Sequence, residues 1–448
     1  MKYSILIKMV ALLLLFLGHK PAFAVPIENV VTDSGQNAYI IRDHETPLIS
    51  ISIGFKAGWS YDPPGKEGLA LFAEAMMNEG AGELSSQQFQ EALADNGIEL
   101  STDSGADDFI IRLSFLTEKK EQAAHLLHLA LTQLRLDDAA MERNRQQLLA
   151  ALSQDRNDPD KLAGDALQHL MFPDHAYGRA GAYTESSIKS INPADLRAFA
   201  RSNFVKNTAN IAAVGDISEK ALKEFLDKVF TGIPEKGSME KMADTEMKAK
   251  AGIGIIKLDI PQSAIVFSAP AIALKDPDFY AAYILNYILG GGGFSSRLMQ
   301  EIRVKRGLSY GIDTDLINRD HASFLFGSVK TKRSSTKETI DLIKSIWKEM
   351  QQEGPTQEEL ERAKTYIIGY YPRNFATLES SASLLLGLQL DKLGIDYPEK
   401  RRAYFEAVTL EDVRRVARRM LDPDKLTFVI VGMPEDIKAN IDIPAASH

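Results

Sequence analysis

Cysteine is absent from the 448-residue sequence. Its absence excludes disulfide bonds and any catalytic arrangement built on a Cys/His pair. A chain of this length buries a core large enough to be stable without disulfides, even after export. No Ser/His/Asp arrangement suggests itself either, so the common nucleophilic hydrolase sites are not indicated.

Basic residues are also fewer than acidic ones. The chain has 52 Lys and Arg residues against 61 Asp and Glu residues; without Lys2, Lys8 and Lys20 of the N-terminal segment 49 basic residues remain, a net charge of −12. Such an acidic surface repels phosphate backbones, and we therefore expect no nucleic-acid partner.

Long apolar runs are missing beyond the N-terminus, so we expect no membrane anchor. Residues 1–24 combine a basic start, a short apolar core and the small-x-small cleavage site Ala22-Phe23-Ala24. We expect a Sec-type signal peptide that is cleaved after Ala24. Export without an anchor predicts a periplasmic location in a bacterium with two membranes.

The second half of the chain repeats short segments of the first in the same order. The matches are DLRAFAR with DVRRVAR (195–201 and 412–418), VG with VG (214–215 and 431–432) and ER with ER (142–143 and 361–362). The first two pairs share one offset, and the offset of the third is almost the same. A period this long indicates duplicated domains rather than a solenoid.

Each half mixes strands with long helices, which predicts an α+β fold of two homologous domains. We expect an N-terminal domain over residues 25–232, a polar linker over 233–252 and a C-terminal domain over 253–448. In each domain an antiparallel-rich sheet would pack against long helices. Two such halves could face each other across a chamber.

Two stretches of the first half have clear patterns. Residues 48–55, LISISIGF, alternate apolar and small polar residues, as a half-buried strand does. Residues 68–79, GLALFAEAMMNE, are apolar nearly all round and predict a buried helix.

Residues 290–315, GGGGFSSRLMQEIRVKRGLSYGIDTD, predict a helix followed by a strand. Ser295 or Ser296 is placed to N-cap the helix, and Gly307 to end it. The helix face predicted to be buried carries Leu298, Met299 and Ile302. From Leu308 onward a strand would place Tyr310, Ile312 and Thr314 on one side, and Ser309, Gly311, Asp313 and Asp315 on the other.

This segment delivers Arg303 near the end of the helix and Tyr310 on the strand. A fixed guanidinium beside a phenol O–H suits a carbonyl or an oxyanion that must be held and polarised. Taken alone, the pair is more often a surface arginine and a tyrosine half-buried on a sheet. No Lys-Ser/Thr pair follows the four glycines, which disfavours a phosphate loop.

The chain resembles the pitrilysin/insulinase-type zinc peptidases, in the branch of the mitochondrial processing peptidase and its bacterial relatives. The motifs that carry the resemblance are GLA at 68–70, DP at 158–159, FPDHAYG at 172–178, VGD at 214–216 and SSRLMQEIRVKRGLSYG at 295–311. Arg303 and Tyr310 match the family's Arg/Tyr pair. The resemblance implies that they bind the substrate carbonyl and help stabilise the tetrahedral intermediate.

The chain departs from this family at its metal site. Active members carry H-x-x-E-H, two zinc-binding histidines with a Glu general base between them. Here Leu71 and Ala75 stand in place of the histidines, and Ala151 stands where the third ligand is expected. Glu74 alone is retained, as a relic of the base or as a hydrogen-bonded acid. We therefore expect no metal and no cofactor in this chain.

A replacement metal site would have to use His125 and His128, which are one helical turn apart, with Glu121 one turn earlier. In an amphipathic helix such residues more often lie on the solvated or boundary face than bind a metal. Metal binding at these histidines remains an open alternative.

The leading hypothesis is a non-catalytic subunit of a heteromeric zinc metallopeptidase. A homologous sister subunit would bring zinc and the general base, and this chain would bring Arg303 and Tyr310 to the same peptide substrate. The alternative is a non-enzymatic peptide-binding or scaffold protein of the same fold. A third hypothesis, a self-sufficient hydrolase with an unrecognised site, predicts peptide cleavage by the chain alone.

Overall fold

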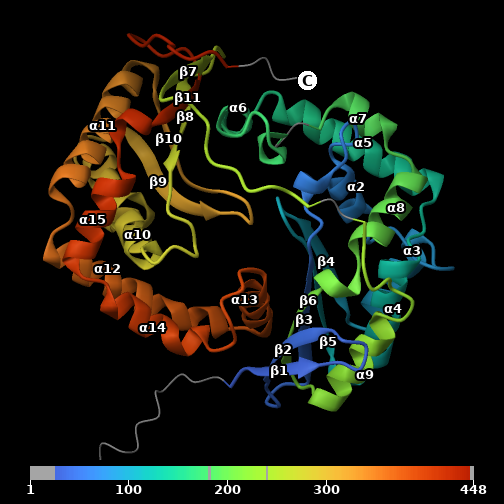
Figure 1. Cartoon of the computed structure of the whole chain (residues 1–448). Helices are drawn as coiled ribbons and strands as arrows, with labels where there is room; N and C mark the ends of the chain where they lie inside the picture. Colours follow the sequence, from blue (N-terminus) through green and yellow to red (C-terminus); the bar gives the residue numbers. More distant parts are fainter. Residues whose placement is uncertain (1–25, 180–182, 239–240, 444–448) are drawn as a thin grey trace, which may run out of the picture.

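The computed structural model describes residues 26–179, 183–238 and 241–443. The predicted signal peptide, residues 1–24, lies outside the described residues. Figure 1 shows two lobes, each with a sheet facing inward and helices around the outside. Within the described ranges no helix is both long and apolar enough to cross a membrane.

The first lobe is built on a six-stranded sheet with the strand order β1-β2-β6-β3-β5-β4. Only the β2–β6 pair is parallel. The strands are β1 (Glu28–Val31), β2 (Asn37–Arg42), β3 (Leu48–Phe55), β4 (Glu99–Ser104), β5 (Phe109–Leu116) and β6 (Asn210–Gly215).

The second lobe repeats this arrangement in a five-stranded sheet with the order β7-β11-β8-β10-β9. Here β7 and β11 form the parallel pair. The strands are β7 (Gly252–Ile256), β8 (Gln262–Pro270), β9 (Ser309–Asn318), β10 (Ser323–Lys332) and β11 (Thr427–Val431). The predicted α+β fold with two related halves is thereby confirmed.

Helices surround each sheet. In the first lobe they are α2 (Leu69–Met76), α3 (Ser86–Asp95), α4 (Lys120–Thr132), α5 (Asp138–Asp155), α6 (Pro159–Met171), α7 (Glu185–Ser190), α8 (Pro193–Asn203) and α9 (Glu219–Val229). In the second they are α10 (Phe279–Asn286), α11 (Thr336–Glu353), α12 (Gln357–Tyr370), α13 (Leu378–Leu390), α14 (Tyr397–Ala407) and α15 (Leu410–Met420). Short π-helical turns η5 (Tyr287–Gly291) and η7 (Met299–Val304) follow α10, with the 3₁₀ turn η6 (Gly293–Ser295) between them.

The two lobes exchange one helix each. Helix α6 of the first lobe packs on β8 and β11 of the second, where Leu167 joins Val266 and Val429 in one apolar cluster. Helix α13 of the second lobe packs on β3 and β6 of the first, beside Val214. The starts of the two helices have the same offset as the repeated ER pairs, so the exchange follows the duplication.

This exchange corrects the prediction of a half-buried strand at residues 48–55. Both faces of β3 are buried, and Ser50 and Ser52 on its polar side are 2% and 1% exposed. A Cβ at Gly54 would meet methyl groups of Leu386 and Leu390 at 3.3 Å, so α13 lies directly on the strand. The covering helix belongs to the other half of the chain and begins only at Leu378, which no local pattern could indicate.

A hairpin turn of the second lobe also inserts into the first. The ammonium of Lys56, at the end of β3, lies 2.8 Å from Asp108 of its own lobe and 2.7 Å from Asp320 in the β9–β10 turn. The buried Tyr177 donates to Asp107 at 2.6 Å, and Asp107 accepts from the Asp320 N–H at 3.1 Å. These contacts, together with the exchanged helices, fix the lobes to each other.

Candidate functional site

Helix α2 is the element that corresponds to the family's zinc-binding helix, and a buried carboxylate starts it. Asp62 accepts from the backbone N–H groups of Gly68, Leu69 and Ala70 at 2.8 to 3.0 Å. These are orphan donors of the first helical turn, and an acid there also complements the helix dipole. Burial raises the pKa of Asp62 to about 7, against the lowering effect of these three hydrogen bonds.

Three of the family's metal positions carry no donor atom. Leu71 lines a cavity, Ala75 is half-buried on α2, and Ala151 is exposed on α5. Zinc needs about three protein ligands with nitrogen, sulfur or oxygen donors, so these residues do not fit it. Nowhere in the described ranges do three His, Cys, Asp or Glu side chains come together in a way that could hold a metal ion.

Glu74, the retained acid, already has partners. Its carboxylate accepts from the backbone N–H of Ser104 at 2.9 Å and from the Ser104 hydroxyl at 2.5 Å. These bonds tie α2 to the edge strand β4. Of the two roles considered for Glu74, the hydrogen-bonded structural acid is the one these contacts favour.

A cavity of about 370 Å³ lies beside this degenerate site. Its walls come from both lobes, with Leu71 and Ser104 from the first and Phe326 of β10 from the second. Asp160, at the start of α6, also lines the cavity and forms an ion pair with Lys330 of β10. Of the three metal positions, Leu71 is thus the one that opens onto this cavity, with an apolar side chain in place of a ligand.

The histidine pair of α4 is not assembled as a metal site. His125 is exposed, whereas His128 contacts the Val229 carbonyl at 3.1 Å through Nδ1. Glu121 forms an ion pair with Lys228. The placement agrees with the expectation that both histidines lie on a solvated or boundary face.

The segment before β9 differs in detail from its prediction. The residues expected on the buried helix face are buried, and Gly307 ends the helix with a φ of +63°. The helical turn η7 is of the π type, however. The helical stretch begins at Arg297, so Ser296 stands at the N-cap position, and its carbonyl accepts from the Gln300 N–H at 3.0 Å. The predicted side-chain cap is not formed in the described residues, because Ser295 and Ser296 donate their hydroxyls to the Gly292 and Gly293 carbonyls at 2.7 and 2.8 Å.

The glycines that precede η7 allow a close backbone approach. A Cβ at Gly290 would lie 2.3 Å from the hydroxyl oxygen of Thr314 on β9, which is well inside contact distance. The run therefore packs the η5 turn onto the strand. This structural role accounts for glycine at the position without a phosphate ligand.

Tyr310 does not lie on the side of β9 where alternation places it. Ser309 pairs with Thr331 and Ile312 pairs with Val329, so Tyr310 and Gly311 together oppose the single residue Lys330. This is a β-bulge, which inserts one extra residue and reverses the side-chain direction. As a result Tyr310 is 83% exposed, whereas Ile312 is 1% exposed. The prediction that they share a side was wrong.

Arg303 projects from the end of η7 and stacks on an aromatic ring. Its guanidinium carbon lies 4.5 Å from the centroid of the Phe294 ring, which is itself 59% exposed. Within the part of the chain that the structure describes, no carboxylate pairs with Arg303 and no hydrogen-bond partner meets the Tyr310 hydroxyl. Both groups thus keep their N–H and O–H donors free, although no direct contact joins the two side chains.

Two features of the site were missed in the sequence. Phe294 was not singled out, although an aromatic residue directly after four glycines is a usable signal for an exposed ring. Asp62 was not recognised as a cap because it lies six residues before Gly68, and the Pro63-Pro64 loop that folds it back has no standard capping spacing.

Comparison with known proteins gives this arrangement a family. Residues 38–185 match the insulinase (peptidase family M16) domain, and residues 190–367 match the peptidase M16 inactive domain. A Helicobacter pylori protein named non-peptidase homolog YmxG is 28% identical over 393 residues, covering 87% of this chain and 90% of that protein. The mitochondrial-processing peptidase subunit beta of Lentinula edodes is 19% identical over 407 residues, 87% of this chain and 86% of that subunit.

A solved structure agrees with this assignment. The crystal structure described as the peptidase M16 inactive domain from Pseudomonas fluorescens superimposes with a TM-score of 0.85 at 27% sequence identity. The match covers 93% of this chain and 100% of that one. Together with the two domain matches, it shows that the chain belongs to peptidase family M16 and that it is a member without the family's H-x-x-E-H zinc motif.

Proposed function

We propose that the chain is the non-catalytic subunit of a heteromeric zinc metallopeptidase. A homologous sister subunit supplies zinc and the general base, and this chain supplies Arg303 and Tyr310. The observation that carries the proposal is the contrast between the two sites. Leu71 has replaced a metal donor, whereas Arg303 and Tyr310 present unpartnered donors to solvent.

The chemistry expected of this pair is stabilisation of developing negative charge. When water attacks a peptide carbonyl, its oxygen becomes an oxyanion, and fixed donors aimed at that oxygen lower the barrier. The guanidinium is always charged, and the Phe294 ring limits its freedom before substrate binds. The β-bulge directs the phenol outward, where a second chain can meet it.

The proposal extends to substrate and compartment. Peptides in extended form are the expected substrates, because both domain matches are to a peptidase family. The basic and apolar N-terminal segment supports export to the periplasm. Two named relatives are consistent with a helper role, since one is called a non-peptidase homolog and the other a subunit.

The test pairs this chain with a homologue from the same organism that carries an intact H-x-x-E-H. Tyr310→Phe and Arg303→Ala should each lower kcat for an unstructured peptide by about 10²- to 10³-fold, the cost of losing one oxyanion donor. The zinc content of the complex and its assembly, followed by size-exclusion chromatography, should stay unchanged. Tyr404→Phe, a tyrosine of the same lobe outside this site, is the matched control.

Unchanged turnover in both variants, with the complex intact, would reject the donor role. It would favour the scaffold alternative, in which the walls of the chamber matter and the two side chains are dispensable.

A further inference from the structure

Exposed aromatic side chains gather on the second lobe. Tyr283, Phe294, Tyr310, Tyr366, Tyr370 and Tyr404 are all more than a third exposed. In the first lobe, by contrast, the described large apolar side chains with comparable exposure are aliphatic: Val31, Leu48 and Leu116. Single exposed apolar residues are ordinary, but a contiguous group usually marks a binding surface.

Three of the second-lobe tyrosines form a row, here called the tyrosine ladder. The ring of Tyr287 on η5 lies 5.2 Å from that of Tyr366 on α12. Tyr366 stacks in turn on Tyr370, one helical turn along, at 5.5 Å with 15° between the ring planes. Among the aromatic rings of the described ranges, each of the three stacks only within this row, so the ladder is one ring wide. Two of its members remain about half exposed, Tyr366 at 52% and Tyr370 at 46%.

One end of the ladder lies near Arg303, one of the two proposed oxyanion donors. The hydroxyl of Ser295 lies 3.5 Å from the Tyr287 hydroxyl, and Ser295 follows Phe294, whose ring holds Arg303. At the other end the Arg373 guanidinium lies 5.2 Å from the centroid of the Tyr370 ring. Neither of these stacked arginines forms an ion pair within the ranges that the structure describes.

The duplication places the ladder at the counterpart of the lost metal site. The offset that relates the ER pair of α5 to the ER pair of α12 also takes Ala151 to Tyr370. Thus the position that would hold a metal ligand in the first lobe carries an exposed tyrosine in the second.

We propose that the tyrosine ladder is a subsite for an extended peptide, which it guides toward Arg303 and Tyr310. This inference rests on the proposed function. It adds the place where the part of the peptide away from the scissile bond lies. Ring faces accept apolar, aromatic or proline side chains with little loss of conformational entropy. The stacked guanidinium groups keep their in-plane N–H donors for main-chain carbonyls of the peptide.

A peptide fits the ladder better than a folded partner does. A stable protein interface buries roughly 800 Å² on each side around a broad apolar core. The ladder is a single row of rings instead, with Arg373 at one end and, beyond Ser295 and Phe294, Arg303 near the other. The width of this row matches a single extended peptide.

The experiment measures binding of a fluorescein-labelled unstructured peptide, with spaced Phe and Leu residues, to the isolated mature chain by fluorescence anisotropy. The double variant Tyr366→Ala/Tyr370→Ala should weaken binding about tenfold or more, as loss of aromatic anchors does. Tyr366→Phe/Tyr370→Phe keeps the rings and should stay within about twofold of the wild type. Tyr404→Ala, whose ring contacts Tyr280 and Tyr397, is the matched control.

The readouts separate this inference from the proposed function. Tyr310→Phe should lower turnover in the complex without changing the Kd of the peptide for the isolated chain, whereas the ladder variants change that Kd. Two results would overturn the ladder subsite: no binding by the wild-type chain, or an unchanged peptide Kd in the double alanine variant. An unchanged Kd together with loss of sister-subunit binding would make the ladder a subunit interface. Thermal unfolding midpoints should match across all variants.

Discussion

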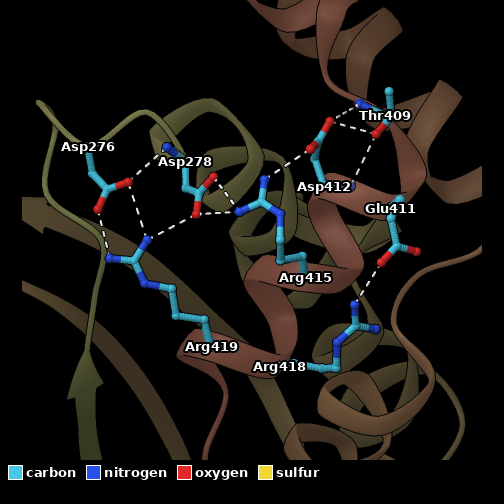
Figure 2. A network of polar contacts seen from close by, with 8 residues as sticks. All are labelled: Asp276, Asp278, Thr409, Glu411, Asp412, Arg415, Arg418 and Arg419. Atoms are coloured by element: carbon cyan, nitrogen blue, oxygen red, sulfur yellow. Dashed lines mark hydrogen bonds and ion pairs between the residues drawn. The ribbon is translucent and has the colours of Figure 1, made fainter.

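The two lobes begin equivalent helices in opposite ways. Helix α2 starts on the buried Asp62, which meets three backbone N–H groups. Helix α10 starts beside Asp276 and Asp278, which form ion pairs with Arg415 and Arg419 of α15 (Figure 2). One lobe uses a desolvated carboxylate and the other a solvated charge network. The comparison teaches that a duplicated fold keeps its geometry while its electrostatics change.

The loop before α2 and the loop before α10 also carry charges of opposite sign, and so do the helices α8 and α15 with which they form ion pairs. In the first lobe a loop lysine, Lys66, pairs with Asp195 on α8 at 2.8 Å. In the second lobe the loop carries the acids and α15 carries the arginines. The apolar contacts have not drifted in this way, because Ala163 and Leu167 of α6 match Ala382 and Leu386 of α13 at the offset of the ER pairs. Packing constrains these positions more tightly than surface charge does.

The two lobes also differ in the residues that stand at their candidate functional positions. The first lobe has lost the metal donors at Leu71, Ala75 and Ala151, and its Glu74 is tied to Ser104. The second lobe presents Arg303 and Tyr310 with free donors. This contrast is the one that the proposed function requires of a subunit that contributes only an oxyanion site.

The largest expected effect concerns the exchanged helices. Leu167→Ala on α6 and Leu386→Ala on α13 should each lower the free energy of unfolding by about 2 to 5 kcal/mol, since both side chains are fully or almost fully buried. Urea unfolding measures both, and the exposed Leu116→Ala serves as the control. If only one of the two variants is destabilised, the two packings are not equivalent and the comparison fails.

The second effect is a difference between the lobes in how stability depends on pH. Because burial raises the pKa of Asp62 to about 7, the folded state holds a proton that the unfolded state has released above about pH 4. The contribution of Asp62 to stability therefore falls as pH rises from about 4 to 7, by at most about 1.4 kcal/mol per pH unit. Urea unfolding over this range should show that Asp62→Asn flattens the slope.

The second lobe should respond in the opposite direction. Hydrogen bonds from Thr409 hold the pKa of Asp412 at about 2, and the Arg419 hydrogen bond lowers the pKa of Asp276. Their stabilisation is fully present above the ordinary pKa of 3.8 and is lost as pH falls toward the lowered value. Asp276→Asn should therefore lower stability at neutral pH, where the stabilisation is present, and should flatten the loss on the acid limb. An acid limb as steep as that of the wild type would contradict the assignment.

The smallest effect is expected from the exposed network of Figure 2. Arg415→Gln and Arg419→Gln should each cost less than about 1 kcal/mol, because exposed ion pairs gain little over hydration. The loss should shrink further in about 1 M salt, where the Debye length is about 3 Å. Urea unfolding at low and high salt checks both statements. A loss of several kcal/mol that salt does not reduce would show that the network makes a large contribution to the stability of the fold.

Local patterns in the sequence predicted the features that depend on nearby residues. The α+β fold, the buried face of Leu298, Met299 and Ile302, and the end of the helix at Gly307 follow from periodicity and capping chemistry. The missing zinc donors were equally visible, because a ligand position can be checked residue by residue.

Features set by distant partners could not be predicted. The polar face of β3 is buried by α13, and the bulge that exposes Tyr310 is fixed by its pairing with β10. A serine hydroxyl can bond forward into a helix or back to a turn, and the tight glycine turn decided this for Ser295 and Ser296. For β3 and the bulge the deciding contact belongs to another segment of the chain, whereas for the two serines two local partners compete and the sequence does not decide between them.

The most direct test of the central claim is hydrolysis of an unstructured peptide, in the presence of zinc, by this chain alone, by its H-x-x-E-H homologue alone, and by an equimolar mixture of the two. We expect no turnover and no stoichiometric zinc in this chain alone, and turnover in the mixture well above the sum of its parts. Cleavage by the isolated chain, with one zinc bound tightly per molecule, would contradict the division of labour.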